Sequence, residues 1–172
     1  MTNMANRAYL FPADSPTLDW PDMVSGESHH YYDSRHALPL AWLFFFRTTD
    51  IKLDGDEIYF ASDRKSACDY FLTRKSLVQD IAGTKPDYLE EIHSNVSEWP
   101  SGDFLVMRPV SVGDFYSENL TYIQQILSTI AMPDTNVQLV IQTIQQFTGQ
   151  PIPTRFGISD RDERDLIGCT YG

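Results

Sequence analysis

The stretch that decides the fold runs from residue 51 to residue 61 and reads Ile-Lys-Leu-Asp-Gly-Asp-Glu-Ile-Tyr-Phe-Ala. Asp54-Gly55 lies between two segments in which apolar and polar residues alternate. This arrangement is typical of a β-hairpin, because glycine accepts the positive φ of a tight turn. We therefore expect strands near residues 51–54 and 57–61.

A helix is expected directly after this hairpin, over residues 62–82. Ser62 can cap its first turn, and apolar residues then recur at intervals of three and four. Thr84 and Asp114 are suited to cap later helices. The same apolar spacing predicts three further helices, over residues 85–97, 115–131 and 135–148.

Two buried runs supply the other expected strands, near residues 7–11 and 103–108. The strands do not alternate strictly with helices, so a doubly wound parallel sheet is not expected. The sequence therefore predicts an α+β fold, in which four helices pack against a small, largely antiparallel sheet. Its length of 172 residues fits one domain over residues 1–172.

Two segments fall between the expected elements. Residues 12–36 contain three prolines and lack a periodic apolar pattern, which predicts a long ordered surface loop. Residues 38–46, Leu-Pro-Leu-Ala-Trp-Leu-Phe-Phe-Phe, are apolar on all sides and are expected to be buried. A short helix is favoured there because proline fits a first helical turn, but a central strand stays open.

The charge is strongly acidic: 24 Asp and Glu stand against 13 Lys and Arg, for a net charge of −11. Such a surface repels nucleic acids and anionic membranes and attracts a basic protein. The alternative is that the acidic residues only keep the protein soluble. No apolar run reaches the length of about 18 residues that a membrane span needs, and the N-terminus lacks a signal-peptide pattern, so a cytoplasmic location is expected.

The densest cluster of polar and aromatic residues lies in and near the predicted loop. Tyr and Arg are typical anchors of binding sites, although the same residues also commonly hold a long loop against its own domain. We interpret the cluster as a candidate partner-binding site made of Trp20, Tyr31, Tyr32, Asp33, Arg35 and His36.

A second interpretation of the same segment is a metal site. His29, His30, Asp33 and His36 are of the residue types that ligate metals, but their spacing matches no compact metal-binding motif. They leave a metal-dependent hydrolase as an alternative function. We expect no bound metal, cofactor or catalytic residue otherwise, because the chain has neither a nucleophile elbow nor a phosphate-binding loop.

Two single residues on helices are candidates for chemistry, and each has a structural explanation. Cys68 follows the inward-facing Ala67, so we expect a half-buried, inert thiol. His93 is expected at a helix surface.

The last two helices form an unusually neutral stretch, since no Lys or Arg occurs between Pro109 and Thr154. Interface cores are depleted in charge. A homo-oligomer, such as a homodimer, is therefore another alternative. Glutamine is also simply a good neutral helix former. The candidate interface residues are Gln124, Gln125, Gln138, Gln142 and Gln146.

The opening Met4-Ala5-Asn6-Arg7-Ala8-Tyr9-Leu10 resembles that of an uncharacterised family of small bacterial proteins, a domain of unknown function. The segments 32–35 and 39–42 are similar as well. This family has no established activity, so the resemblance implies no catalytic residue. In size and acidity alone, the chain also resembles immunity proteins of bacterial toxin systems.

We therefore expect a non-catalytic, acidic protein-binding protein, an immunity-like or regulatory partner of a basic bacterial protein. The acidic residues would steer the encounter, and aromatic anchors would hold the complex.

Overall fold

The structure is a computed structural model that describes residues 7–18, 30–35, 38–82, 86–109, 115–148, 156–157 and 169–171. For residues 35, 81–82, 86, 147–148, 156–157 and 169–171 it describes the backbone only.

The predicted hairpin is present and lies at the edge of the sheet. β4 (Ile51–Asp54) pairs with β5 (Glu57–Asp63) in antiparallel register, with Asp54 opposite Glu57. Gly55 has a φ of 58° in the turn, which an L side chain rarely adopts. The Asp-Gly pair thus fixes the turn as the sequence predicts.

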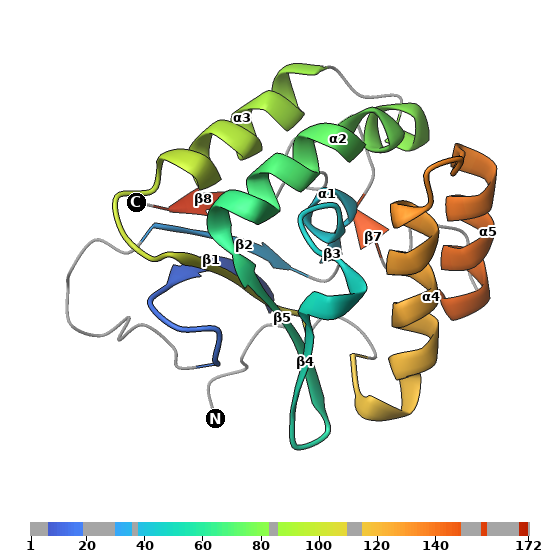
Figure 1. The fold of residues 1–172 in the computed structure, drawn as a ribbon, viewed down its shortest axis with the longest axis horizontal. Coiled ribbons are helices and arrows are strands. Elements are labelled where there is room, and N and C mark those ends of the chain that lie inside the picture. Colours follow the sequence, from blue (N-terminus) through green and yellow to red (C-terminus); the bar gives the residue numbers. More distant parts are fainter. Residues whose placement is uncertain are drawn as a thin grey trace.

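The sheet has six strands in the order β4-β5-β6-β1-β2-β8, and every neighbouring pair is antiparallel. A separate parallel pair joins β3 (Leu38–Pro39) to β7 (Phe156–Gly157). The predicted α+β class with a small antiparallel sheet is confirmed (Figure 1). The remaining strands are β6 (Phe104–Arg108), β1 (Arg7–Ala13), β2 (Tyr31–Arg35) and β8 (Cys169–Tyr171).

The surface-loop prediction for residues 12–36 is wrong at both ends, because β1 extends to Ala13 and a further strand begins at Tyr31. Residues 31–35 form β2, which pairs with β1 on one side and with β8 on the other. β2 contains a buried aspartate, Asp33, and this interrupts the alternation of apolar and polar residues that marks a strand in sequence. Residues 19–29 and 36–37 of the predicted loop lie outside the described residues.

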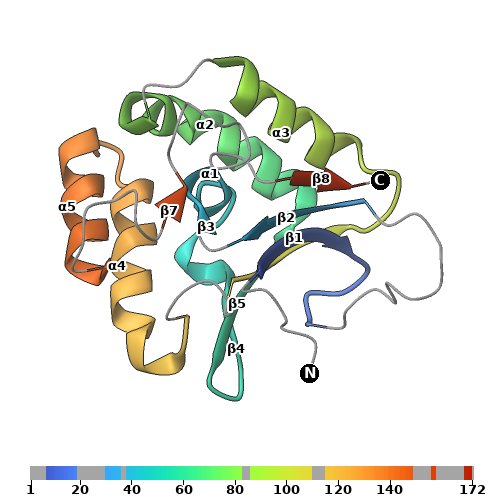
Figure 2. The ribbon, with the colours of Figure 1, turned by 180° about the vertical axis from the view of Figure 1, so that it is seen from behind.

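Two long helices cover one face of the sheet. α2 (Arg64–Ala82) and α3 (Pro86–Glu98) run side by side above the strands (Figures 1 and 2). The prediction that Ser62 caps α2 is wrong by one residue: Oδ1 of Asp63 accepts the hydrogen bond from the amide of Ser66 at 2.8 Å. Ser62 is instead buried at the end of β5.

The other predicted helices are also present. A 3₁₀ turn, η3 (Ser117–Asn119), precedes α4 (Leu120–Ala131), so the helix expected over residues 115–131 begins later than predicted. α5 (Val137–Thr148) follows, and the α4–α5 pair lies to one side of the sheet (Figure 2). The predicted caps Thr84 and Asp114 lie outside the described residues.

The apolar segment 38–46 lies in the main core. It forms the short helix α1 (Leu40–Leu43), as favoured, preceded by β3. All three consecutive phenylalanines are fully buried, and the ring of Phe45 stacks on that of Phe71 in α2 at 4.2 Å. A smaller cluster on the opposite sheet face contains Phe11, Tyr59, Ala61 and Val106. Among the described residues, no helix is long and apolar enough to cross a membrane.

Candidate functional site

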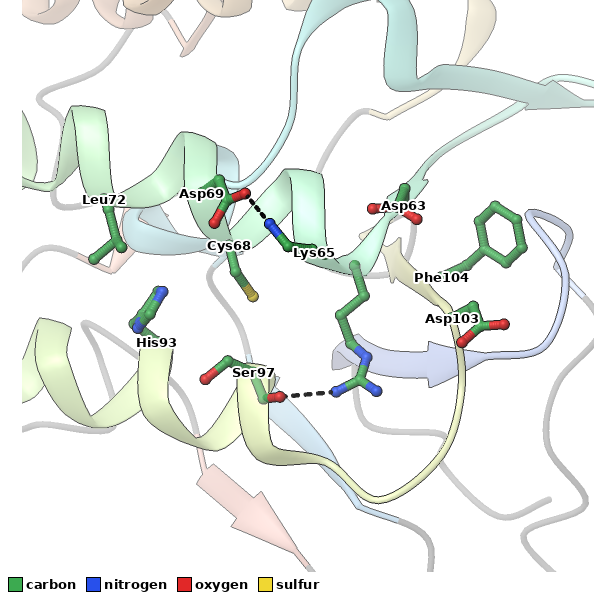
Figure 3. A pocket seen from close by; sticks show the side chains of 10 residues that line it. Asp63, Lys65, Cys68, Asp69, Leu72, His93, Ser97, Asp103 and Phe104 are labelled. Carbon is green, nitrogen blue, oxygen red and sulfur yellow. Dashed lines mark hydrogen bonds and ion pairs between the residues drawn. The ribbon is translucent and has the colours of Figure 1, made fainter.

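A cavity of about 520 Å³ lies between α2, α3 and the start of β6 (Figure 3). Its α2 wall comes from positions 64, 65, 68, 69 and 72, and its α3 wall from positions 93 and 97. These intervals of three and four residues place each set on one face of its helix. We call this space the α2–α3 cavity; it is lined by Asp63, Arg64, Lys65, Cys68, Asp69, Leu72, His93, Ser97, Asp103 and Phe104.

Arg64 holds the two helices in place around the cavity. Its Nε donates to the carbonyl of Gly102 at 2.7 Å, and its Nη1 donates to the carbonyl of Val96 at 2.8 Å. Val96 lies in the last turn of α3, so the guanidinium satisfies a carbonyl that the helix leaves free and complements the negative end of its dipole. The position of α3 against α2 is therefore fixed by polar contacts as well as by the core.

Cys68 and His93 form the inner part of the cavity lining, which we call the floor. Cys68 is 4% exposed, and its sulfur points from α2 into the space between the helices (Figure 3). Burial raises the pKa of the Cys68 thiol to about 11. The thiol is therefore protonated near neutral pH, whereas a nucleophile or a metal ligand must be a thiolate. This agrees with the expected inertness, although Cys68 is more deeply buried than predicted.

His93 is the second floor residue, and it extends from α3 toward α2 (Figure 3). Its ring stacks against that of Phe71, with centroids 6.1 Å apart. Burial lowers the pKa of His93, and the charge of Lys75 lowers it further. The imidazole is thus neutral at neutral pH, so the floor carries no charge. The expectation that His93 lies at a helix surface misses its place in the cavity wall.

The rim of the cavity is acidic and exposed. Asp63, Asp69 and Asp103 lie around it, and Asp69 pairs with Lys65 at 2.8 Å. No Lys or Arg occurs from Pro86 to Glu98, and the outer face of α3 adds the exposed carboxylates of Asp87, Glu90, Glu91 and Glu98. The site thus combines an uncharged floor with an acidic surround.

Leu72 is a large apolar side chain at the cavity's edge, and it is 47% exposed. A large apolar side chain beside a cavity is typical of a binding surface. With the neutral floor, it makes the cavity suited to an apolar group carried by a ligand or a partner.

The predicted partner-binding residues are not gathered at one surface. Tyr32 is fully buried, and its hydroxyl accepts a hydrogen bond from Nδ2 of Asn95 at 2.7 Å. Tyr31, its neighbour on β2, is half-buried among the residues packed on the opposite face of the sheet. The backbone of Arg35 ends β2, while Trp20 and His36 lie outside the described residues.

The histidine cluster of the hydrolase alternative is only partly placed. His30 and Asp33 are described, whereas His29 and His36 are not. Asp33 is buried and forms an ion pair with Arg7. Within the described part of the chain, no group of three or more His, Cys, Asp or Glu side chains could hold a metal ion.

The glutamines of the predicted oligomer interface lie on two neighbouring helices. Gln124, Gln125, Gln138, Gln142 and Gln146 are all exposed along the α4–α5 pair. Three large apolar side chains are exposed beside them, those of Tyr122, Met132 and Leu139.

Comparisons with known proteins assign no family to this arrangement. No family model matches the chain, and neither a curated protein nor a solved structure matches it significantly. The resemblance of its first residues to a small bacterial family therefore remains an expectation.

Proposed function

We propose that this chain is a non-catalytic protein-binding protein, which takes an apolar group of a basic partner into the α2–α3 cavity. The supporting observation is the contrast between the cavity's uncharged floor and its acidic rim. The class of protein that fits is a cytoplasmic bacterial regulator or an immunity-like partner that acts by occlusion.

The charge at the rim favours a basic partner. Lys65 is paired with Asp69, and the side chain of Arg64 donates its hydrogen bonds to backbone carbonyls. Glu90 of α3 is also paired, with Lys75 of α2 at 4.0 Å, and the other exposed carboxylates of the rim and of α3 leave an acidic excess around the cavity. Long-range attraction to a basic surface raises the association rate and weakens at high salt.

The floor argues against a reactive thiolate. A protonated Cys68 is a poor nucleophile, and the neutral His93 does not supply the positive charge that stabilises a thiolate. An uncharged floor instead costs less to desolvate, when an apolar side chain covers it, than a charged floor would.

A photo-crosslinking experiment tests the location. A photoreactive amino acid replaces Leu72 in cells that express the protein, and a matched variant carries it at Leu53, which is 49% exposed on the β4–β5 hairpin. We expect a basic protein to be crosslinked from position 72 and not from position 53, and to bind the unmodified chain after purification. Equal crosslinking from both positions, or a purified product that does not bind, contradicts the proposal.

A further inference from the structure

The outer surface of α4 and α5 is the least charged helical surface in the described structure. We define the α4–α5 face by three residues of each helix: Tyr122, Gln125 and Met132 on α4, and Leu139, Gln142 and Gln146 on α5. All six are exposed. Tyr122, Met132 and Leu139 are 44%, 40% and 38% exposed, so apolar side chains of considerable size face outward here.

The two helices are joined as one rigid surface. Oγ1 of Thr129 and Oγ1 of Thr143 lie 3.2 Å apart across the seam between them. Their inward faces bury Ile123, Leu127 and Val140, among others, in the main core. The relative position of the two helices is therefore set before any partner arrives, which reduces the entropy lost on binding.

Charge is nearly absent from this region. Among residues 115–148 the only ionised side chains are those of Glu118, before α4, and Asp134, between the helices. The whole chain carries a net charge of −11. Two copies therefore repel each other in most relative orientations. A face without charge offers the least electrostatic resistance to self-association.

We infer that the α4–α5 face binds a second copy of this chain and forms a two-fold symmetric dimer. The glutamine side chain suits such an interface, because its amide both donates and accepts hydrogen bonds and can pair with the same group of a symmetry mate. A basic partner finds no carboxylate on this face, so it is better matched to the acidic rim of the α2–α3 cavity. The dimer is thus independent of the binding function proposed for that cavity.

Analytical ultracentrifugation of the full chain over a range of concentrations tests the inference. Gln125→Glu, Gln125→Lys and Leu139→Glu are the test variants, because two-fold symmetry brings each new charge into the interface twice. Leu53→Glu is the control, since it adds the same charge at an exposed leucine of the hairpin. Circular dichroism verifies that each variant is folded.

We expect the wild-type chain to dimerise and the three test variants to weaken dimerisation about tenfold or more, since like charges at an interface are strongly disfavoured. Leu53→Glu should match the wild type. An equimolar mixture of Gln125→Glu and Gln125→Lys should restore the dimer. Added salt should strengthen the wild-type dimer by screening the repulsion between two acidic molecules. A wild-type monomer at all concentrations, or a dimer unaffected by the test variants, overturns the inference.

Discussion

Arg7 and Asp33 form an ion pair between the neighbouring strands β1 and β2, with Nη1 of Arg7 2.9 Å from Oδ2 of Asp33. The side chain of Asp33 is only 3% exposed. A carboxylate at such a depth needs a charged partner, because burial without one is costly. This pair therefore explains how an acidic residue can occupy an inner strand of the sheet.

The first prediction concerns this pair. Arg7→Met leaves Asp33 buried without its cation and should lower the free energy of unfolding by about 2–4 kcal/mol. Lys65→Met is the control, because Lys65 forms an exposed pair with Asp69, and it should leave the free energy of unfolding almost unchanged. Urea denaturation followed by circular dichroism measures both changes. An equal decrease in the free energy of unfolding for the two variants would show that the Arg7–Asp33 pair stabilises the fold no more than an exposed pair does.

The same pair shows why part of the sheet was not predicted. The Asp54-Gly55 turn is a local signal, and residues 51–63 form the expected hairpin. β2 has no such signal, since its pairing with β1 and β8 depends on residues distant in sequence. An aspartate within a strand is expected on a solvent-facing side, and the local sequence does not show that Arg7 on the neighbouring strand supplies a cation for it.

The candidate site was less accessible to sequence analysis than the fold. Helical spacing predicts both α2 and α3 but does not state which of their faces meet. Cys68 and His93 lie 25 positions apart, and each alone is an ordinary helix residue. The acidic face of α3 could have been noticed, because no Lys or Arg occurs from Pro86 to Glu98. The exposed glutamines of α4 and α5, by contrast, were predicted together from their helical positions.

The second prediction concerns the protonation of Cys68. The pKa of its thiol should be about 11 in the folded chain, whereas the pKa of an unfolded cysteine is about 8.5. Between these values the unfolded state loses its proton first, so this group's contribution to stability is present below about pH 8.5 and is lost as the pH rises toward 11. Alkylation rates and thiolate absorbance in a Cys169→Ser background measure the folded value. Rapid alkylation at pH 7, as in the urea-unfolded control, would contradict a buried, neutral floor.

The third prediction concerns the backbone beside the cavity. Gly102 has a φ of 90°, and a Cβ there would lie 2.7 Å from Cβ of Pro12 and 2.8 Å from the amide nitrogen of Ala13. Gly102→Ala should therefore reduce stability by about 2–4 kcal/mol through backbone strain and steric clash. It should also disturb the bond from Nε of Arg64 to the Gly102 carbonyl, which helps to set the cavity's shape.

Gly55→Ala is the matched control for this change. Gly55 also has a positive φ, but no atom lies within 4 Å of a Cβ added there. Its substitution should cost about 1 kcal/mol from backbone strain alone. Thermal unfolding of both variants compares the two costs, and a greater loss for Gly55→Ala would be inconsistent with the close approach of Pro12 to Gly102.

The proposed binding function depends most on the α2–α3 cavity being the surface that holds a protein partner. Its most direct test is calorimetric titration of the partner crosslinked at position 72 with three purified chains: wild type, Leu72→Asp and Leu53→Asp. We predict that Leu72→Asp weakens binding about tenfold or more, as removal of an interface anchor does, and that Leu53→Asp binds like the wild type. Undiminished affinity of Leu72→Asp would contradict the claim that the partner occupies this cavity.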